Sequence, residues 1–330
     1  MLKCALAAVL VVATAGTVSS ATLPGGYHLI PGRVPLDWQG PDGNTIVLDA
    51  PHGLIVVDTG RSPQHAQAIL DYAKSQGKPI AAIFNSHWHL DHTTGNHDLR
   101  QAYPEAQVYA TTAIEGALAG FLGGDREQAD KTLADPKVPG PQKAQIRRGR
   151  YRTDNPDTLR PTRPVTQTGP VSIAGRELDL HVARFAATEA DLWIYDPKAK
   201  VAMVGDLVVD IVPFMDTACA DGWAKALDAV AAVPFTTLVP GHGPVMDRTD
   251  FLTWKTAFNN LLSCARSDAD KKLCIAGWQK DAAKLIDEAH REYVAAALDY
   301  YIDTRLRSSP DEQQKYCKPL TAAAPKSERG

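Results

Sequence analysis

The sequence carries little excess charge of either sign. Its 330 residues include 35 Lys and Arg against 38 Asp and Glu, which gives a formal net charge of −3. Chains that bind nucleic acid or anionic membrane surfaces usually carry a marked basic excess, and only the stretch 143–163 is strongly basic here. We therefore expect a small-molecule substrate and no nucleic-acid partner.

The most apolar run near the N-terminus is short. Residues 4–15 cannot cross a bilayer as a mature helix, which needs about 20 apolar residues. The run follows Met1-Leu2-Lys3 and precedes Ser19-Ser20-Ala21, a pattern typical of a signal peptide over residues 1–21. An uncleaved anchor fits the short core less well. We expect a periplasmic or secreted protein with no stable membrane span after cleavage.

Cysteine is scarce, and no two cysteines form a C-x-x-C pair. This spacing argues against structural zinc held by cysteine. After cleavage, Cys219, Cys264, Cys274 and Cys317 remain, and four cysteines allow three connectivities. The closeness of Cys264 and Cys274 favours their pairing, which leaves Cys219 with Cys317; buried thiols are the alternative.

A short stretch after a predicted strand concentrates potential metal ligands. The apolar run 80–84 indicates a buried strand, and His87, His89, Asp91 and His92 follow it. Positions i and i+2 of extended backbone face the same side, so we expect His87 and His89 to share one ion. Asp91 and His92 suit a second ion better. Imidazole and carboxylate ligands favour zinc or its first-row neighbours, and a histidine-rich surface loop is the weaker interpretation.

Apolar patterning predicts two halves of the chain, in each of which strands and helices alternate. The predicted strands are 45–48, 54–57, 80–84, 108–110, 171–173, 177–185, 192–195, 201–204 and 237–239, and the predicted helices are 63–74, 221–231 and most of 249–307.

Two segments stand apart from this alternation. Residues 123–163 predict an inserted helix and a long loop, in which Arg147 and Arg148 are candidates to hold an anionic substrate group; a solvated surface is the favoured alternative. Residues 249–330 predict a helical C-terminal extension. Its apolar positions predict a face packed on the main domain or on a second subunit of a homodimer: Leu285, Ile286, Val294, Ala297, Leu298 and Tyr301.

Together, the motifs resemble those of the metallo-β-lactamase superfamily. His87-x-His89-x-Asp91-His92 after a strand is similar to the family signature. Asp58, in Val56-Val57-Asp58-Thr59-Gly60, Asp206, in Val204-Gly205-Asp206, and His242, in Gly241-His242-Gly243, match its other motifs in the expected order. The resemblance covers residues 28–248 and implies an α+β fold, an αββα sandwich with metals at one edge of two facing sheets. The expected metallo-β-lactamase-like domain is 22–248.

The resemblance also implies a role for each matching residue. His87, His89 and Asp206 would hold a first zinc ion, and Asp91, His92, Asp206 and His242 a second. Asp91 would orient or accept the proton of the attacking water, and Asp58 would orient a ligand histidine through its other nitrogen. Two metals roughly 3.5–4 Å apart can ionise a water held between them.

One family ligand has no counterpart in this chain. The family's third motif carries a histidine where this sequence has Ala187, in the run Ala186-Ala187-Thr188-Glu189-Ala190-Asp191. Alanine cannot coordinate a metal. Glu189 and His181 are the nearby substitutes, and both are poorly placed in the sequence. The residues matched to the second zinc ion are therefore expected to bind metal, and those matched to the first ion are expected to bind it weakly. This gives one or two zinc ions per chain.

These patterns predict an exported zinc-dependent hydrolase that cleaves an ester, thioester or amide bond through a metal-activated water. The replacement at Ala187 motivates an alternative: a metal-binding accessory protein of a periplasmic redox or quinoprotein system. Residues 181–223 more loosely resemble exported metallohydrolases associated with quinoproteins, through Asp216-Thr217-Ala218-Cys219 and Gly222-Trp223.

Overall fold

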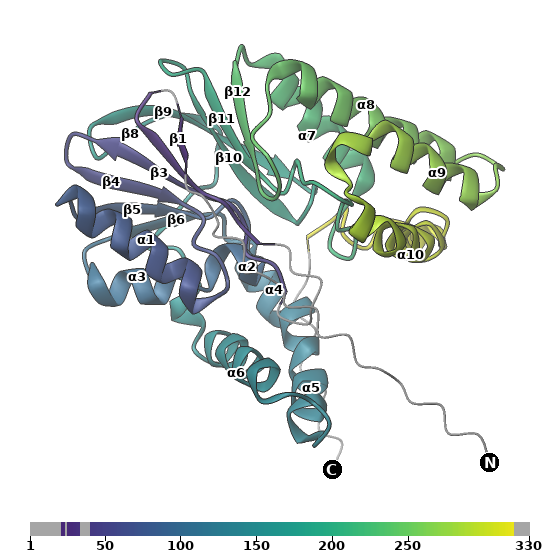
Figure 1. The fold of residues 1–330 in the computed structure, drawn as a ribbon, viewed down its shortest axis with the longest axis horizontal. Coiled ribbons are helices and arrows are strands. Elements are labelled where there is room, and N and C mark those ends of the chain that lie inside the picture. The colour runs from purple at the N-terminus through teal and green to yellow at the C-terminus, as the bar shows by residue number, and fades with distance from the viewer. Residues whose placement is uncertain (1–20, 24, 34–39, 320–330) are drawn as a thin grey trace, which may run out of the picture.

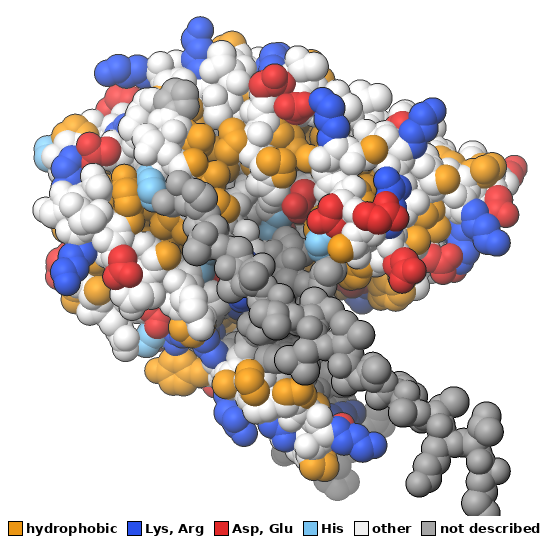
Figure 2. Space-filling model, in the orientation of Figure 1, with side chains coloured by type: hydrophobic (Ala, Val, Ile, Leu, Met, Phe, Trp, Pro, Cys, Tyr) orange, Lys and Arg blue, Asp and Glu red, His pale blue; other side chains and the backbone are white. Residues whose placement is uncertain are grey.

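The computed structural model describes residues 21–23, 25–33 and 40–319, with the side chains of 125–127 left out. The signal peptide predicted over residues 1–21 lies outside the described residues except for Ala21, so that prediction stays open. Across the described residues, no helix is both long and apolar enough to span a membrane. On the face drawn in Figure 2, basic and acidic side chains are interspersed, in keeping with the small net charge.

Two sheets face each other at the centre of the molecule (Figure 1). The first has its strands in chain order: β1 (Ala21–Leu23), β2 (Tyr27–Ile30), β3 (Thr45–Ala50), β4 (Gly53–Val57), β5 (Ile80–Phe84), β6 (Gln107–Ala110) and β7 (Arg163–Pro164). The second has the order β12-β11-β10-β9-β8, built from β8 (Gly169–Ile173), β9 (Arg176–Arg184), β10 (Ala190–Asp196), β11 (Val201–Gly205) and β12 (Thr237–Pro240).

Each sheet is parallel where its strands lead to the site. Strands β4, β5, β6 and β7 pair in parallel, and β11 pairs in parallel with β12. The loops that carry the predicted site residues follow β4, β5, β11 and β12. Because β4 pairs in parallel with β5, and β11 with β12, the loops of each pair begin at the same edge of their sheet. The strands predicted over residues 80–84 and 201–204 match β5 and β11 closely.

Helices cover the outer face of both sheets, which completes the αββα sandwich (Figure 1). Helices α1 (Pro63–Gln76) and α3 (Asn96–Ala102) lie on the first sheet, and α7 (Ala220–Ala232) and α8 (Arg248–Ala265) on the second. Helix α1 begins where the Ser62 side chain accepts a hydrogen bond from the His65 amide, and ends at Gly77 with φ 62°. An apolar cluster that includes Leu48, Phe84 and Ile194 fills the space between the sheets.

The insertion is more helical than its sequence predicts. Helix α4 (Ile114–Ala119) precedes it, and its own elements are α5 (Phe121–Ala134), which begins just before residue 123, α6 (Gly140–Asp154) and the short 3-10 turn η1 (Pro156–Thr158). Two helices therefore replace the expected helix and long loop. Helix α5 ends at Ala134, shortly before Pro136, and α6 begins after Pro139 with Pro141 in its first turn, where proline is compatible with a helix. The backbone that carries Asp91 and His92 is also helical rather than extended: residues 90–93 form α2 (Leu90–Thr93), and α3 follows.

Several basic residues of the insertion make contacts within the chain. Arg148 pairs with Asp98 at 2.6 Å and also donates to the Arg61 carbonyl at 3.2 Å. Arg150 pairs with Asp130 at 2.5 Å. These pairs favour the structural interpretation of the basic stretch over a role in holding substrate.

The C-terminal extension packs on the second sheet as predicted. It consists of α8, α9 (Lys271–Asp281), η2 (Ala283–Leu285), η3 (Glu288–His290), α10 (Arg291–Tyr301), the π-helical turn η4 (Ile302–Leu306) and α11 (Pro310–Gln313). Ile286, Val294, Leu298 and Tyr301 are buried in one cluster with Trp223 of α7. This face is therefore used within the chain, and the homodimer stays a prediction.

Both favoured disulfides are present. Cys264 pairs with Cys274 inside the extension, and Cys219 pairs with Cys317, 98 residues further along the chain. The second bond ties the end of the extension to the loop that precedes α7.

Candidate metal centre

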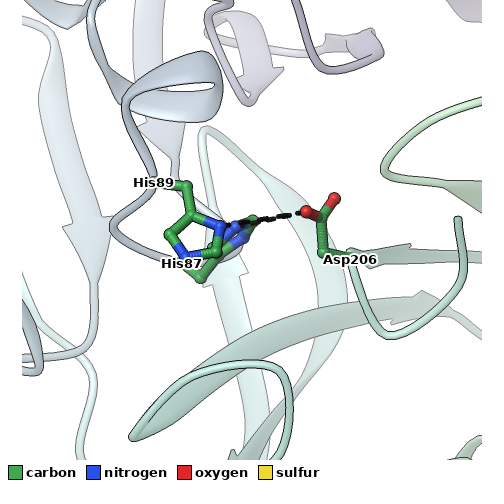
Figure 3. Close-up of side chains that lie close together, drawn as sticks. All are labelled: His87, His89 and Asp206. Carbon is green, nitrogen blue, oxygen red and sulfur yellow. Dashed lines mark ion pairs between the residues drawn. The ribbon is translucent and has the colours of Figure 1, made fainter. Parts of the chain in front are cut away.

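The first group of ligand atoms lies at the end of β5. His87 and His89 leave the strand on the same side, and both rings point toward Asp206, which follows β11 (Figure 3). The distance to Asp206 Oδ2 is 3.5 Å from His87 Nε2 and 4.0 Å from His89 Nδ1. These atoms can hold one metal ion together.

The second group combines α2 with the loop after β12. His92 Nε2 lies 3.2 Å from His242 Nε2, which lies 3.2 Å from Asp91 Oδ2. His92 Nε2 and Asp91 Oδ2 are 3.7 Å apart. Four ligand atoms about 2.0–2.1 Å from a tetrahedral zinc ion are about 3.3 Å from one another. The spacing of these three atoms fits such an ion.

Asp206 stands between the two groups. Its Oδ2 faces His87 and His89, whereas its Oδ1 lies 3.1 Å from His92 Nε2 and 3.6 Å from His242 Nε2. A single carboxylate can therefore contribute one oxygen to each ion. A Cβ at position 241 would collide with Asp206 Oδ1, so the glycine before His242 is required for this approach.

The donor set fits a cation because two of its buried ligand atoms lack any other partner. Asp206 Oδ1 and His87 Nε2 are buried and make no hydrogen bond. His87, Asp91, His92, Asp206 and His242 are each less than 9 % exposed. Leaving buried polar atoms unpaired costs about 1–3 kcal/mol each, and a metal ion would remove that cost.

The charges of the site also favour a cation. Burial lowers the pKa of His89 to about 4, so its ring is neutral and able to coordinate. Burial alone would lower the pKa of His92 too, but Asp206, Asp58 and Asp91 raise it well above its usual value. Asp206 keeps a lowered pKa despite burial because His92, His242 and His87 surround it. A bound metal ion would therefore balance the negative charge of these carboxylates.

Asp58 is placed against the side of the ligand histidines that faces away from Asp206. It follows β4 in a left-handed conformation with φ 60°. Its Oδ2 accepts from His92 Nδ1 at 2.9 Å and from the Ser86 hydroxyl at 2.7 Å. Because the Ser86 hydroxyl donates a hydrogen bond to Asp58, it accepts one from His87 Nδ1 at 2.9 Å. One carboxylate therefore sets the tautomer of a histidine in each group.

Thr217 plays the same part for His89 and was not foreseen from the sequence. Its hydroxyl donates to the Ala187 carbonyl at 3.0 Å and therefore accepts from His89 Nε2, also at 3.0 Å. The free lone pair of His89 is then on Nδ1, which faces Asp206. Thr217 lies 128 residues from His89, so no local spacing in the sequence signals the contact.

Ala187 and its suggested substitutes contribute no ligand atom to either group. Ala187 is buried in the turn between β9 and β10 and belongs to an apolar cluster. His181 stacks on Trp193 with ring centroids 3.7 Å apart. Among the described residues, the two groups of three potential ligands contain neither His181 nor Glu189.

A cavity of about 320 Å³ opens in front of the two groups. Arg61 lines it, and its guanidinium lies 3.5 Å from Asp91 Oδ1. Arg61, rather than Arg147 or Arg148, is therefore the cationic side chain that the structure places beside the candidate ligands. It follows the Asp58-Thr59-Gly60 motif directly, a proximity that could have suggested it.

The sequence matches a known protein family and is similar to individual curated proteins. The family model for the metallo-beta-lactamase superfamily matches residues 38–242. A hydroxyacylglutathione hydrolase from Nostoc sp. is 37% identical over 89 residues, which cover 26% of this chain and 35% of that protein. A linear primary-alkylsulfatase from Pseudomonas sp. is 26% identical over 223 residues, 61% of this chain and 42% of that protein. The chain thus spans well under half the length of these two curated relatives.

A solved structure extends the likeness over most of the chain. The stereoselective inverting sec-alkylsulfatase Pisa1 from Pseudomonas sp. superposes with a TM-score of 0.56 at 20% identity, covering 92% of this chain and 52% of that one. At this identity the likeness concerns the fold alone, including helices beyond the residues that the family model matches.

Proposed function

The chain belongs to the metallo-beta-lactamase superfamily, and from this premise we propose that it is an exported zinc-dependent hydrolase of ester-type bonds. The observation that carries the proposal is the position of Asp206, whose two oxygens face two separate groups of buried ligand atoms. The hydrolases among its relatives support the reaction class.

Zinc is proposed from the chemistry of the donors. Four imidazoles and two carboxylates, with no thiolate, suit zinc and its first-row neighbours better than magnesium or calcium. When bound, zinc supplies Lewis acidity that polarises an ester group and lowers the pKa of water.

The chain's own residues position and handle the proton. Asp91 lines the cavity, and its pKa is lowered despite burial because His92, His242 and Arg61 stabilise the carboxylate. An ionised Asp91 can orient a water and accept its proton. Arg61, beside it, can donate to an oxygen of the substrate. Asp58 and Thr217 keep the histidine lone pairs directed inward, so the site needs little rearrangement during turnover.

Export is proposed from the signal-like N-terminus and the two disulfides. Disulfides persist in the periplasm and outside the cell but are rare in the cytosol. A periplasmic or secreted location therefore accounts for all four cysteines that follow the predicted cleavage site.

The proposal is tested by loading the mature protein with zinc and assaying a panel of carboxylic esters, thioesters, lactams and sulfate esters. We expect turnover of at least one ester class, and its loss in Asp206→Asn together with a fall in bound zinc. Asp228→Asn, an exposed carboxylate paired with Lys255, is the matched control. Zinc-loaded protein without turnover anywhere in the panel would overturn the hydrolase proposal.

The alanine at position 187 supports a second candidate function, that of a metal-binding accessory protein of a periplasmic redox or quinoprotein system. With alanine in the turn beside Thr217, the first group holds two histidines and the shared Asp206 only. A partner captured equally well by Asp91→Ala and unmodified protein, combined with no turnover, is the result that this candidate requires.

A further inference from the structure

The cavity in front of the ligand groups has one polar end and an extended apolar wall. His89, Asp91, Asp206, Asp210, His242 and Arg61 form the polar end. The apolar lining comprises Pro41, Trp88, Leu90, Phe121, Leu122, Val209, Ile211, Val212, Phe214 and Tyr293. Activation of water requires only the polar end, so the hydrolytic chemistry leaves the apolar wall unexplained.

The wall is assembled from four separate parts of the chain. Trp88 comes from the ligand loop and contacts Phe121 of α5, with ring centroids 5.7 Å apart. Phe214 follows β11 and stands edge-on to His89 at 5.3 Å. Tyr293 comes from α10 in the C-terminal extension. The start of α5, which leads into the insertion, and α10 of the extension lie at different positions around the sandwich (Figure 1), and both contribute to this one cavity.

Two of these aromatic side chains remain partly open to solvent. Phe214 is 36% exposed and Tyr293 is 56% exposed. Large apolar side chains that gather in an exposed concave surface usually mark a binding site. The ring of Phe214 also contacts that of Tyr301, 6.2 Å away between ring centroids, so the C-terminal extension supports this part of the wall.

A second cavity adjoins the first. It has a volume of about 220 Å³, lies against α5 and α6, and shares Arg61, Leu90 and Leu122 with the first cavity. These three side chains therefore line both cavities.

We infer that the cavity binds an amphiphilic ester, with its ester group beside Asp91 and Arg61 and a hydrocarbon chain along the wall formed by Trp88, Phe121, Phe214 and Tyr293. This inference rests on the proposed ester hydrolysis and adds the class of substrate. The polar end matches the group that reacts, and the wall matches the part that does not. Binding energy from the chain then holds the ester group in place.

The experiment compares p-nitrophenyl acetate, butyrate, hexanoate and octanoate, all below their aggregation limits, with zinc-loaded mature protein. Each buried methylene contributes about 0.8 kcal/mol, so kcat/KM is expected to rise about fourfold per methylene until the cavity is filled. Equal kcat/KM values along the series, or the highest value for acetate, would overturn the inference while leaving ester hydrolysis intact.

A binding measurement separates this inference from the proposed function. Butanoate and octanoate are titrated calorimetrically into the same protein, without any turnover. Tighter binding of octanoate supports the apolar wall even if no ester is hydrolysed. Equal binding of both acids, or of neither, contradicts it.

Variants locate the chain-binding wall. Phe214→Ala and Tyr293→Ala are expected to lower the ratio of octanoate to acetate kcat/KM about tenfold each. Tyr300→Ala removes an exposed tyrosine from the same helix as Tyr293, 45% exposed and not among the residues that line the cavity, and should leave the ratio unchanged. Thermal unfolding of each variant shows whether it is folded. Folded Phe214→Ala and Tyr293→Ala proteins with an unchanged ratio would overturn the assignment.

Discussion

The hydroxyl of Thr217 lies 3.0 Å from Nε2 of His89, a residue 128 positions earlier in the chain. Because the same hydroxyl donates its proton to the Ala187 carbonyl, it can only accept from the histidine. His89 is thereby fixed in the tautomer whose Nδ1 lone pair faces Asp206. Thr217 is a positioning residue, since it acts on the candidate metal ligand through a hydrogen bond.

Thr217→Val should weaken zinc binding at the first group, about tenfold. Partners of metal-binding histidines contribute roughly 10–100-fold to metal affinity, and valine keeps the shape of threonine without its acceptor. Competition with a chromophoric chelator measures the affinity directly, without reference to activity.

Thr217→Ser provides the matched control because it retains the hydroxyl. We expect it to restore most of the affinity that the valine variant loses. If serine and valine variants bind zinc equally weakly, packing rather than the hydrogen bond is responsible, and the positioning role is wrong.

Asp58→Asn should weaken zinc binding at both groups. Asp58 accepts from His92 and Ser86, and through Ser86 it fixes His87. Asparagine tolerates the left-handed conformation that Asp58 adopts, so the backbone is preserved while the charge and one acceptor are lost. Chelator competition is expected to show both dissociation constants rising by about tenfold or more.

Asp49→Asn is the control for this loss of charge. Asp49 lies on the neighbouring strand β3, with a side chain that is 56% exposed and paired with Lys78. Its variant should bind zinc like the unmodified protein. A decrease of the same size in both variants would mean that general electrostatics, and not the contact with His92, sets the affinity.

Ala187→His should raise the zinc content of the mature protein from one tightly held ion to two. The turn that carries Ala187 reaches the first group through the contact between Thr217 and His89, and a third imidazole would complete that group. Elemental analysis after dialysis gives the number of ions per chain. Two ions already present in the unmodified protein would show that another group or water completes the first site.

The sequence predicts the site well where the ligands are contiguous. His87, His89, Asp91 and His92 follow one strand, so their closeness in the sequence places them together at its end. The family resemblance then adds Asp206 and His242 from distant strands, and the structure brings all six within reach of two ions. Buried strands and amphipathic helices leave strong local patterns, so the individual elements are predicted from the sequence, whereas the αββα sandwich that they form is implied by the family resemblance.

The remainder depends on tertiary contacts that leave no local pattern. Thr217 and Phe214 lie in an irregular loop, and only folding brings them to His89. The insertion has low hydrophobicity, so its composition suggested a loop, whereas ion pairs such as Arg150 with Asp130 join its helices. The importance of Tyr293 could not be predicted because the position of the extension depends on the packing of α10.

Removal of the Cys219–Cys317 disulfide should destabilise the protein more than removal of Cys264–Cys274. The two bonds join residues 98 and 10 positions apart, and the longer loop restricts the unfolded chain more. The loop-entropy relation gives a difference of about 2 kcal/mol. Urea unfolding of the paired Cys→Ser variants measures it; a larger loss for the short loop would show that native contacts dominate instead.

Asp196 should make the stability of the fold depend on pH in the acidic range. Its side chain accepts hydrogen bonds from Tyr27 at 2.7 Å and from Arg176 at 2.7 Å, joining the second sheet to strand β2 of the first. Although burial opposes ionisation, the Ala199 amide, Tyr27 and Arg176 hold the pKa of Asp196 below its usual value.

A lowered pKa in the folded state means that the stabilisation is fully present above the pKa of the unfolded chain, about 3.9, and is lost as pH falls toward the folded value. Asp196→Asn removes this titration. The gap in urea midpoint between the unmodified protein and Asp196→Asn should therefore be widest near neutral pH and narrow below about pH 4. Asp228→Asn, at an exposed pair with Lys255, should show a small gap at every pH. A gap for Asp196→Asn that stays constant down to acidic pH would mean that its hydrogen bonds do not depend on ionisation.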